Sequence, residues 1–298
     1  ADAIDLLKGQ LFVDLGRFDA ALEPLERIDV SNKPADVVVS VLYLKGMAYR
    51  GAGNLDAAAQ MLKQAAELDT AMRAEAKLDL ARTLIMAGQN AEALQMLDDL
   101  VQQQPSNIAD VARLAGDLSY QNRQYDDAVD YYQIITTGHQ VSPHFPAAAM
   151  GVLWSHHARE NPEALIAAYR RFADALPRHL KPGAAYLASL AYQRLNRHAD
   201  AAELLMQVTR QFPDAEIADQ LLYRLAISQS ELEQYRQMEQ TLMRLLAAYP
   251  QTPLRPDAMF LLAQADAEQG NAARGVARLT EIVEQGPDHP YFLSSLLQ

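Results

Sequence analysis

The chain has 298 residues, of which 50% are hydrophobic, and it carries no Cys and a formal net charge of -12. An acidic chain without a basic stripe is a poor ligand for nucleic acid or anionic lipid, because both require clustered Lys and Arg. The absence of Cys excludes disulfides, thiolate metal sites and cysteine nucleophiles, and no apolar run is long enough to predict insertion into a membrane.

Pairs of predicted helices recur eight times along the chain, at intervals of 35 to 37 residues. In each copy a first helix carries a small residue, a turn follows about seven residues later, and a second helix opens near another small residue. The clearest copy contains Gly46, Tyr49, the turn Gly53-Asn-Leu55 and Ala58. A fixed period of this length indicates a solenoid, in which each repeat packs only on its neighbours.

The small residue of each first helix is expected to let the second helix approach closely, while a bulkier residue three positions later, such as Tyr49 or Trp154, fills the adjacent space. Gly or Asn opens most of the turns, because these residues tolerate the left-handed conformation that ends a helix. In chain order, the small residues of the first helices are Gly9, Gly46, Ala81, Gly116, Gly151, Ser189, Ala226 and Ala263.

We expect a single array over 1–298, with residues 289–298 starting a further or capping helix. Because the pattern is interrupted at both ends, the chain is expected to be a segment of a longer protein. The fifth repeat departs from the pattern, since its turn from Ala158 to Glu163 is expected to be one residue longer than the others. The predicted repeats span roughly residues 2–35, 39–71, 74–106, 109–141, 144–178, 182–214, 219–251 and 256–288.

The sequence of small residue, aromatic residue, turn Gly, Ala and closing Pro resembles the tetratricopeptide repeat (TPR) family over the whole chain. The second, third, fourth and sixth repeats carry the match residue by residue. The resemblance implies an all-α fold, a right-handed α-solenoid of about eight helix-turn-helix repeats. The closing residues are Pro34, Pro105, Pro177, Pro213, Pro250 and Pro287.

Two junctions between repeats, Phe212-Pro213 and Tyr249-Pro250, resemble those of bacterial envelope TPR proteins. These proteins include lipoproteins of outer-membrane assembly and periplasmic scaffolds of exopolysaccharide secretion. The resemblance implies a periplasmic location, with the cytoplasm as the alternative.

TPR arrays bind partner proteins or peptides on a concave side lined by the first helices, so the resemblance implies a site there. The exposed row is expected three residues before, one after and four after each small residue, which in the fifth repeat gives Ala148, Val152 and Ser155. Aromatic and Arg side chains are enriched on partner surfaces, although the alternative is that these aromatic residues pack against the next repeat. The candidates are Tyr43, Arg50, Arg82, Arg113, Tyr120, Tyr186, Gln193, Tyr223, Phe260 and Gln264.

Other features argue against catalysis and metal binding. No Gly-rich phosphate loop, nucleophile elbow or His-Glu-x-x-His motif occurs, so no catalytic residue and no cofactor are predicted. His156 and His157 are adjacent in a predicted helix, where their side chains point about 100° apart and do not readily chelate one ion. The basic cluster between Arg170 and Lys181 is either a second docking patch or a solvated helix end.

The sequence therefore predicts a non-enzymatic protein-interaction scaffold within a bacterial envelope assembly or a polysaccharide-export complex. Two alternatives remain open. One is a structural or self-assembly module that forms homo-oligomers, and the other is a regulatory domain of an enzyme that lies outside this segment. Nucleic acid is not expected as a partner.

Overall fold

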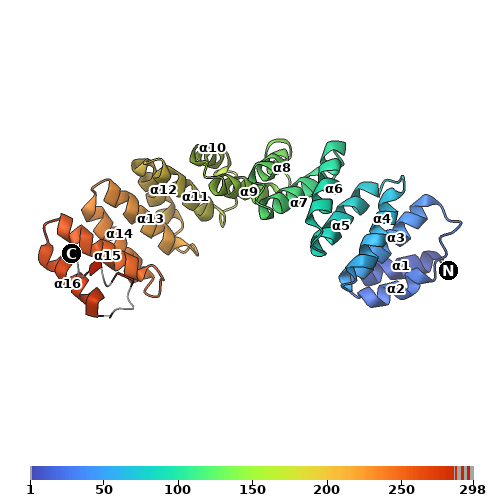
Figure 1. Cartoon of the computed structure of the whole chain (residues 1–298), viewed down its shortest axis with the longest axis horizontal. Coiled ribbons are helices and arrows are strands. Elements are labelled where there is room, and N and C mark those ends of the chain that lie inside the picture. Colours follow the sequence, from blue (N-terminus) through green and yellow to red (C-terminus); the bar gives the residue numbers. More distant parts are fainter. Residues whose placement is uncertain (1, 285, 287–289, 292–293, 296–298) are drawn as a thin grey trace. The chain divides into compact units, whose positions relative to one another are not determined.

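The computed structural model describes residues 2–284, 286, 290–291 and 294–295. Sixteen α-helices and no strand occur in this part of the chain, which confirms the all-α helical-repeat solenoid. The chain divides into two compact units, Ala1–Ala148 and Ala149–Gln298, which we call the N-terminal and C-terminal units and describe separately (Figure 1). The further helix expected over 289–298 falls mostly outside the described residues.

The N-terminal unit stacks helices in chain order (Figure 1). Each first helix packs on the second helix of its own repeat, and that second helix packs on the first helix of the next repeat. The helices are α1 (Asp2–Asp14), α2 (Phe18–Glu26), α3 (Ala35–Gly51), α4 (Leu55–Glu67), α5 (Arg73–Met86), α6 (Asn90–Gln103), α7 (Ile108–Gln121) and α8 (Tyr125–Gly138).

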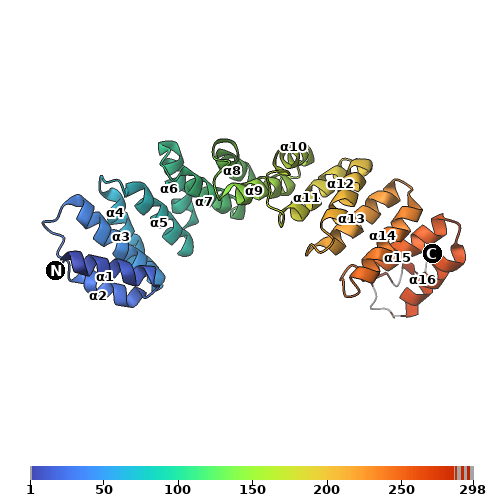
Figure 2. The ribbon, with the colours of Figure 1, turned by 180° about the vertical axis from the view of Figure 1, so that it is seen from behind.

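The C-terminal unit follows the same scheme, and both views show its helices succeeding one another in chain order (Figure 1, Figure 2). The boundary between the two units falls inside α9 (Phe145–Ala158). No described helix is both long and apolar enough to cross a bilayer. The remaining helices are α10 (Pro162–Phe172), α11 (Lys181–Arg194), α12 (His198–Gln211), α13 (Ala218–Glu231), α14 (Tyr235–Ala248), α15 (Arg255–Glu268) and α16 (Ala272–Glu284).

Each turn between the two helices of a repeat contains one residue in the left-handed region. In the second repeat Gly53 has φ 83°, and the next residue, Asn54, caps α4 by accepting a hydrogen bond from the Ala57 N–H at 3.2 Å. The expected Gly or Asn is therefore confirmed in five of the eight turns, whereas an Arg or a Glu takes the left-handed conformation in the other three. The left-handed residues are Gly16, Gly53, Gly88, Arg123, Glu160, Asn196, Glu233 and Gly270.

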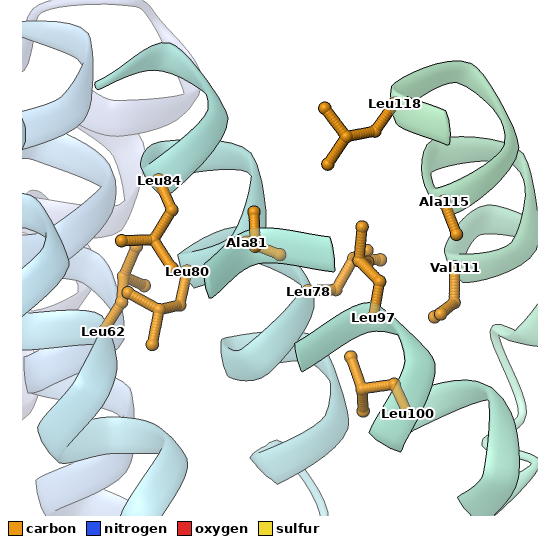
Figure 3. Packing of buried hydrophobic residues seen from close by; sticks show 11 residues of the cluster. Leu62, Leu78, Leu80, Ala81, Leu84, Leu97, Leu100, Val111, Ala115 and Leu118 are labelled. Carbon is orange, nitrogen blue, oxygen red and sulfur yellow. The ribbon is translucent and has the colours of Figure 1, made fainter. Parts of the chain in front are cut away.

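The small residue of the first helix is a point of close approach between paired helices. A Cβ atom placed on Gly46 would lie 2.6 Å from Cγ of Leu62 on α4, and one on Gly116 would lie 2.6 Å from Cε1 of Tyr132 on α8. Figure 3 shows how the helices meet around such positions: Leu97 lies among side chains of neighbouring helices, including Ala81 and Val111. Within each unit, the core is thus a series of layers between successive helices, as in repeat proteins generally.

The fifth repeat has a turn of ordinary length, so the prediction of a longer one is wrong. Glu160 takes the left-handed conformation with φ 56°, and Asn161 caps α10 by accepting from the Ala164 N–H at 3.1 Å. Pro162 fits directly after this cap because its fixed φ and missing N–H suit the first position of a helix.

Consequently, the first helix of this repeat is in a different register from the one predicted. The Asn161 N–H donates to the His156 carbonyl at 3.0 Å, just as the Asn54 N–H donates to the Tyr49 carbonyl at 2.9 Å. Counting back from these bonds places Leu153, not Gly151, at the position of Gly46.

One end of the N-terminal unit exposes an apolar stripe. Ile4, Leu7, Leu11 and Leu15 of α1 and its C-terminal turn are between 56% and 66% exposed. The positions of Ile4 and Leu11 correspond to Val111 and Leu118 in α7, which are at most 2% exposed because they belong to a core cluster with residues of the preceding repeat. The stripe is therefore a helix-packing face that no described helix covers.

Candidate partner-binding face

Three of the candidate residues converge on one carboxylate that the sequence analysis did not identify. Asp79 of α5 is 2% exposed. Its side chain accepts hydrogen bonds from the Tyr43 hydroxyl at 2.6 Å, from Arg50 Nη1 at 2.8 Å and from Arg82 Nη1 at 3.0 Å. Tyr43 and Arg50 lie on α3, so the cluster joins the second repeat to the third.

Burial and hydrogen bonding act on Asp79 in opposite directions. Burial raises the pKa of the Asp79 carboxyl, but the bonds from Tyr43, Arg50 and Arg82 together outweigh it and leave this pKa below its ordinary value. Burial and the neighbouring carboxylate raise the pKa of Tyr43. The group is therefore a charge-paired connection between repeats, and its Arg side chains are engaged with the protein itself.

The two candidates on α7 are also engaged internally. Arg113 Nη1 lies 2.6 Å from Asp117 Oδ2, and the other oxygen of that carboxylate accepts from the Tyr132 hydroxyl at 2.8 Å. The Tyr120 ring packs against Tyr125 at 5.4 Å between centroids, and burial raises the pKa of Tyr120. Arg113 thus does not join the cluster around Asp79.

In the C-terminal unit, Tyr186 and Gln193 of α11 reach the next first helix, α13. Gln193 Nε2 donates to the Arg224 carbonyl at 2.9 Å and to the Ser228 hydroxyl at 2.8 Å. The Arg224 guanidinium carbon lies 5.9 Å from the centroid of the Tyr186 ring. Tyr186 remains partly accessible on the surface of the first helices.

The last three candidates occupy the following first helices. Tyr223 of α13 is half-buried against the core formed with α14, and burial raises its pKa. Phe260 of α15 stacks on Tyr291, with centroids 4.5 Å apart and rings 16° from parallel. Gln264 lines a cavity with Tyr235. These aromatic side chains therefore both pack against the protein and keep part of their surface accessible.

The corrected register of the fifth repeat places the chain's one Trp on the surface row, whereas the sequence predicts a packing role for it. Trp154 takes the place one residue after the small position and is 42% exposed. Its ring meets His157 edge-on at 6.0 Å. The residues predicted for this surface, Ala148, Val152 and Ser155, are instead buried, because the predicted row was displaced by two positions.

A cavity of about 530 Å³ opens beside Trp154 within the C-terminal unit. Its walls bring together three successive repeats. Trp154 and His157 come from α9, Tyr186 and Leu190 from α11, and Arg224 from α13. Further lining comes from His156, Glu160, Asn161, Pro162, Leu165, Leu187, Ala191 and Arg194.

The basic cluster between Arg170 and Lys181 is partly engaged within the protein. The Arg178 guanidinium carbon lies 5.2 Å from the Phe212 ring centroid, and Nη2 donates to the Gln211 carbonyl at 3.5 Å. Lys181 Nζ donates to the Asp174 carbonyl at 3.3 Å. In the part of the chain that the structure describes, no group of three or more His, Asp or Glu side chains is placed to hold a metal ion.

These features define the class of the protein: an all-α helical-repeat solenoid whose first helices present a partly open aromatic surface. Family models described as tetratricopeptide repeat match residues 49–118, 113–179, 184–215 and 223–290. The chain belongs to the tetratricopeptide repeat family. A model described as the N-terminal domain of the ESX-1 type VII secretion system protein EccA1 matches residues 1–79.

Solved structures show the same fold at low sequence identity. A complex of Naa15 and Naa10 bound to HypK-THB matches with a TM-score of 0.61 and 14% identity, over 98% of this chain and 43% of that chain. A TPR protein from Cytophaga hutchinsonii matches with a TM-score of 0.55 and 10% identity, over 98% and 99% of the two chains. A TPR protein from Parabacteroides merdae matches with a TM-score of 0.51 and 12% identity, over 87% of this chain and 98% of that chain. No curated protein sequence matches the chain.

Proposed function

We propose that the chain is a protein-interaction scaffold that binds a segment of a partner protein on the first-helix face of its C-terminal unit. The exposure of Trp154 beside an open cavity carries this proposal. A large aromatic side chain that is 42% exposed offers apolar area to a partner at little cost in conformational entropy. Tyr186, Tyr223 and Phe260 extend the aromatic surface along successive repeats.

The N-terminal unit is a weaker candidate for this role. Arg50 and Arg82 are bound to Asp79, and Arg113 is bound to Asp117. A partner would have to displace these ion pairs before it could use the Arg side chains. The Arg50–Asp79 pair is buried, so breaking it costs several kcal/mol, whereas the pairs of Arg82 and Arg113 are partly exposed and cost less. We therefore assign these Arg side chains to the connection and stabilisation of repeats.

The structural neighbours are consistent with a binding role. The structure with the TM-score of 0.61 contains Naa15 and Naa10 bound to HypK-THB, so a solenoid of this fold occurs in a protein complex. The proposal for this chain is based on its own exposed surface, and it does not assume that the chain shares a partner with those proteins.

Affinity capture with matched variants tests the proposal. Trp154→Ala and Tyr223→Ala should each weaken partner capture from extracts of the native host, whereas Met243→Ala should not. Met243 is a suitable control because it is also a large apolar residue, is 51% exposed and lies on the second helix α14. Undiminished capture by Trp154→Ala, with an unchanged circular dichroism spectrum, would place the partner elsewhere.

We further propose that the scaffold acts in a bacterial envelope complex, in the periplasm. The support is the resemblance of the Phe212-Pro213 and Tyr249-Pro250 junctions to envelope TPR proteins. In the structure, the Tyr249 hydroxyl donates to the Pro213 carbonyl at 2.6 Å, so one junction is tied to the next. Fractionation of the native host tests the location, and recovery in the cytoplasmic fraction alone would refute it.

Self-assembly is a second candidate, favoured by the exposed stripe on α1. Burying Ile4, Leu7, Leu11 and Leu15 against a second copy would remove apolar surface from water. Multi-angle light scattering over a range of concentrations tests this candidate. Leu7→Glu with Leu11→Glu should return any oligomer to the monomer mass, and a monomeric wild type at all concentrations would exclude it.

A further inference from the structure

The cavity beside Trp154 contains a cation without a carboxylate partner. Arg224 contributes to the cavity wall and lies over the Tyr186 ring. It forms no ion pair with any Asp or Glu among the described residues. Glu160 is the one carboxylate in the cavity wall, and it is paired with Arg194. The cavity therefore presents unneutralised positive charge next to apolar side chains.

The N-terminal unit shows how a carboxylate is held at the same repeat positions. Tyr43 lies three residues before the small residue of its repeat, and Asp79 lies two before the small residue of the next one. Their side chains are hydrogen-bonded at 2.6 Å, and Arg50 adds a charge-assisted bond at 2.8 Å. A Tyr and a guanidinium thus bind one carboxylate at the level where two first helices meet.

The C-terminal unit has a Tyr at the same repeat position, but a cation occupies the position of the carboxylate. Tyr186 stands where Tyr43 does, and Arg224 stands where Asp79 does. The residues that the structure describes thus supply the Tyr and the guanidinium here but no carboxylate. Because Arg224 borders an open cavity rather than the closed core around Asp79, a carboxylate from another molecule can reach it.

The apolar part of the wall defines the rest of the ligand. Trp154 and Leu190 lie in the same wall as Arg224, so a bulky apolar group next to the carboxylate would contact them. A volume of about 530 Å³ is large enough for two or three side chains. The ligand that fits is a peptide segment in which an acidic residue adjoins Leu or a similar residue.

We propose that this cavity binds an acidic-apolar peptide segment of the partner, with Arg224 and the Tyr186 hydroxyl taking the carboxylate and Trp154 the apolar side chain. This inference depends on the proposed scaffold function and names the chemistry of its partner. An amide or a neutral side chain in place of the carboxylate leaves the Arg224 charge uncompensated, so the cavity selects for acidic segments.

The fluorescence of Trp154 provides the assay, because the chain has one Trp. The probes are acetyl-Ala-Leu-Glu-Leu-Ala-amide and the same peptide with Gln in place of Glu. We expect a saturable change in Trp154 emission, with the Gln peptide binding about tenfold to a hundredfold more weakly, as for other charge-assisted hydrogen bonds. A third probe, the Gln peptide with a free C-terminal carboxylate, distinguishes a side-chain carboxylate from a chain terminus.

Arg224→Gln should abolish the preference for the Glu peptide, and Arg224→Lys should retain part of it. Arg236→Gln is the matched control, because Arg236 is exposed on α14 and lies outside the cavity wall. Circular dichroism verifies that each variant is folded. Equal binding of the Glu and Gln peptides, an undiminished preference in Arg224→Gln, or no emission change at millimolar peptide would each overturn the inference.

Failure of this inference can be separated from failure of the scaffold function. If Trp154→Ala loses the partner in affinity capture while Arg224→Gln keeps it, the binding face is correct and the acidic specificity is wrong. If both variants keep the partner, the face itself is wrong.

Discussion

Replacing Asp79 by Ala should loosen the connection between the second and third repeats more than any other single truncation in its cluster. The substitution removes the acceptor of three hydrogen bonds and leaves Arg50, whose side chain is only 16% exposed, without its counter-charge. A charge stranded in this way is the main cost, because the remaining guanidinium is largely desolvated and keeps only its bonds to the carbonyl of residue 79, at 3.2 Å, and to Met47 Sδ, at 3.0 Å.

The geometry sets the size of the effect. With an effective dielectric constant of about 20, unit charges separated by 2.8 Å attract by about 6 kcal/mol, and the desolvation of two buried groups offsets most of this. Truncating one partner leaves the desolvation uncompensated, so Asp79→Ala should cost about 3–5 kcal/mol. Tyr43→Phe loses one hydrogen bond to a charged group and should cost about 1.5–3 kcal/mol. Arg82 is 36% exposed, and its truncation should cost less than about 1 kcal/mol.

Hydrogen exchange is the suitable assay, because repeat arrays unfold in parts and one global free energy is not well defined. Amides of α3 and α5 should exchange faster in Asp79→Ala, while those of α13 and α15 in the C-terminal unit should not change. A double-mutant cycle with Arg50→Ala should give a coupling energy above about 1 kcal/mol. Additive effects, or equal losses from Asp79→Ala and Arg82→Ala, would show that the cluster is only a surface ion pair.

The remaining predictions concern acid, packing and exposure. Because hydrogen bonding holds the folded-state pKa of Asp79 below its ordinary value, its contribution to folding stability is present above about pH 4 and is lost as pH falls through the folded-state pKa. Acid titrations followed by circular dichroism should therefore show a smaller loss of stability between pH 5 and pH 2 in Asp79→Asn than in the wild type. In hydrogen exchange, Leu118→Ala should lower the opening free energy of the α7 amides by about 2–5 kcal/mol. Leu11→Ala at the matched position of α1 should lower that of the α1 amides by less than about 0.5 kcal/mol, since Leu118 is 2% exposed and Leu11 is 56% exposed. Acrylamide should quench Trp154 efficiently in the folded protein, and strong protection would show that this side chain is covered.

The fold could be predicted from the sequence because each local feature, such as a turn, recurs in several repeats and each recurrence supports the same structural interpretation. A single Gly such as Gly53 is weak evidence for a turn, but the same residue type at the same interval in several repeats is strong evidence. The physical requirement is also local, since a left-handed residue followed by a cap fixes the turn whatever packs around it. The close approach at Gly46 follows in the same way from the spacing of Gly46 and Leu62.

The fifth repeat shows where this reasoning is insufficient. Gly46 is the residue of close approach in the second repeat, and the sequence pattern predicts the same role for Gly151 in the fifth repeat. The helix accommodates Leu153 at that position instead, and the register is set by the turn at Glu160 and the cap at Asn161. The Asn161 cap and the Pro162 that follows it therefore identify the register of this repeat better than a small residue does, because several side chains can fill a helix contact, whereas Pro fits directly after a cap.

Asp79 and Arg224 were missed for a related reason. Both occupy a column, two residues before the small position, where other repeats have Leu44, Leu114 and Leu187. A charged residue in an apolar column must be compensated, either within the chain or by a ligand. Asp79 is compensated by its neighbours, whereas Arg224 is paired with no described carboxylate and borders open space. Charged departures from the repeat pattern in this apolar column therefore show where compensation is needed, which comes from neighbouring repeats at Asp79 and, in our proposal, from a ligand at Arg224.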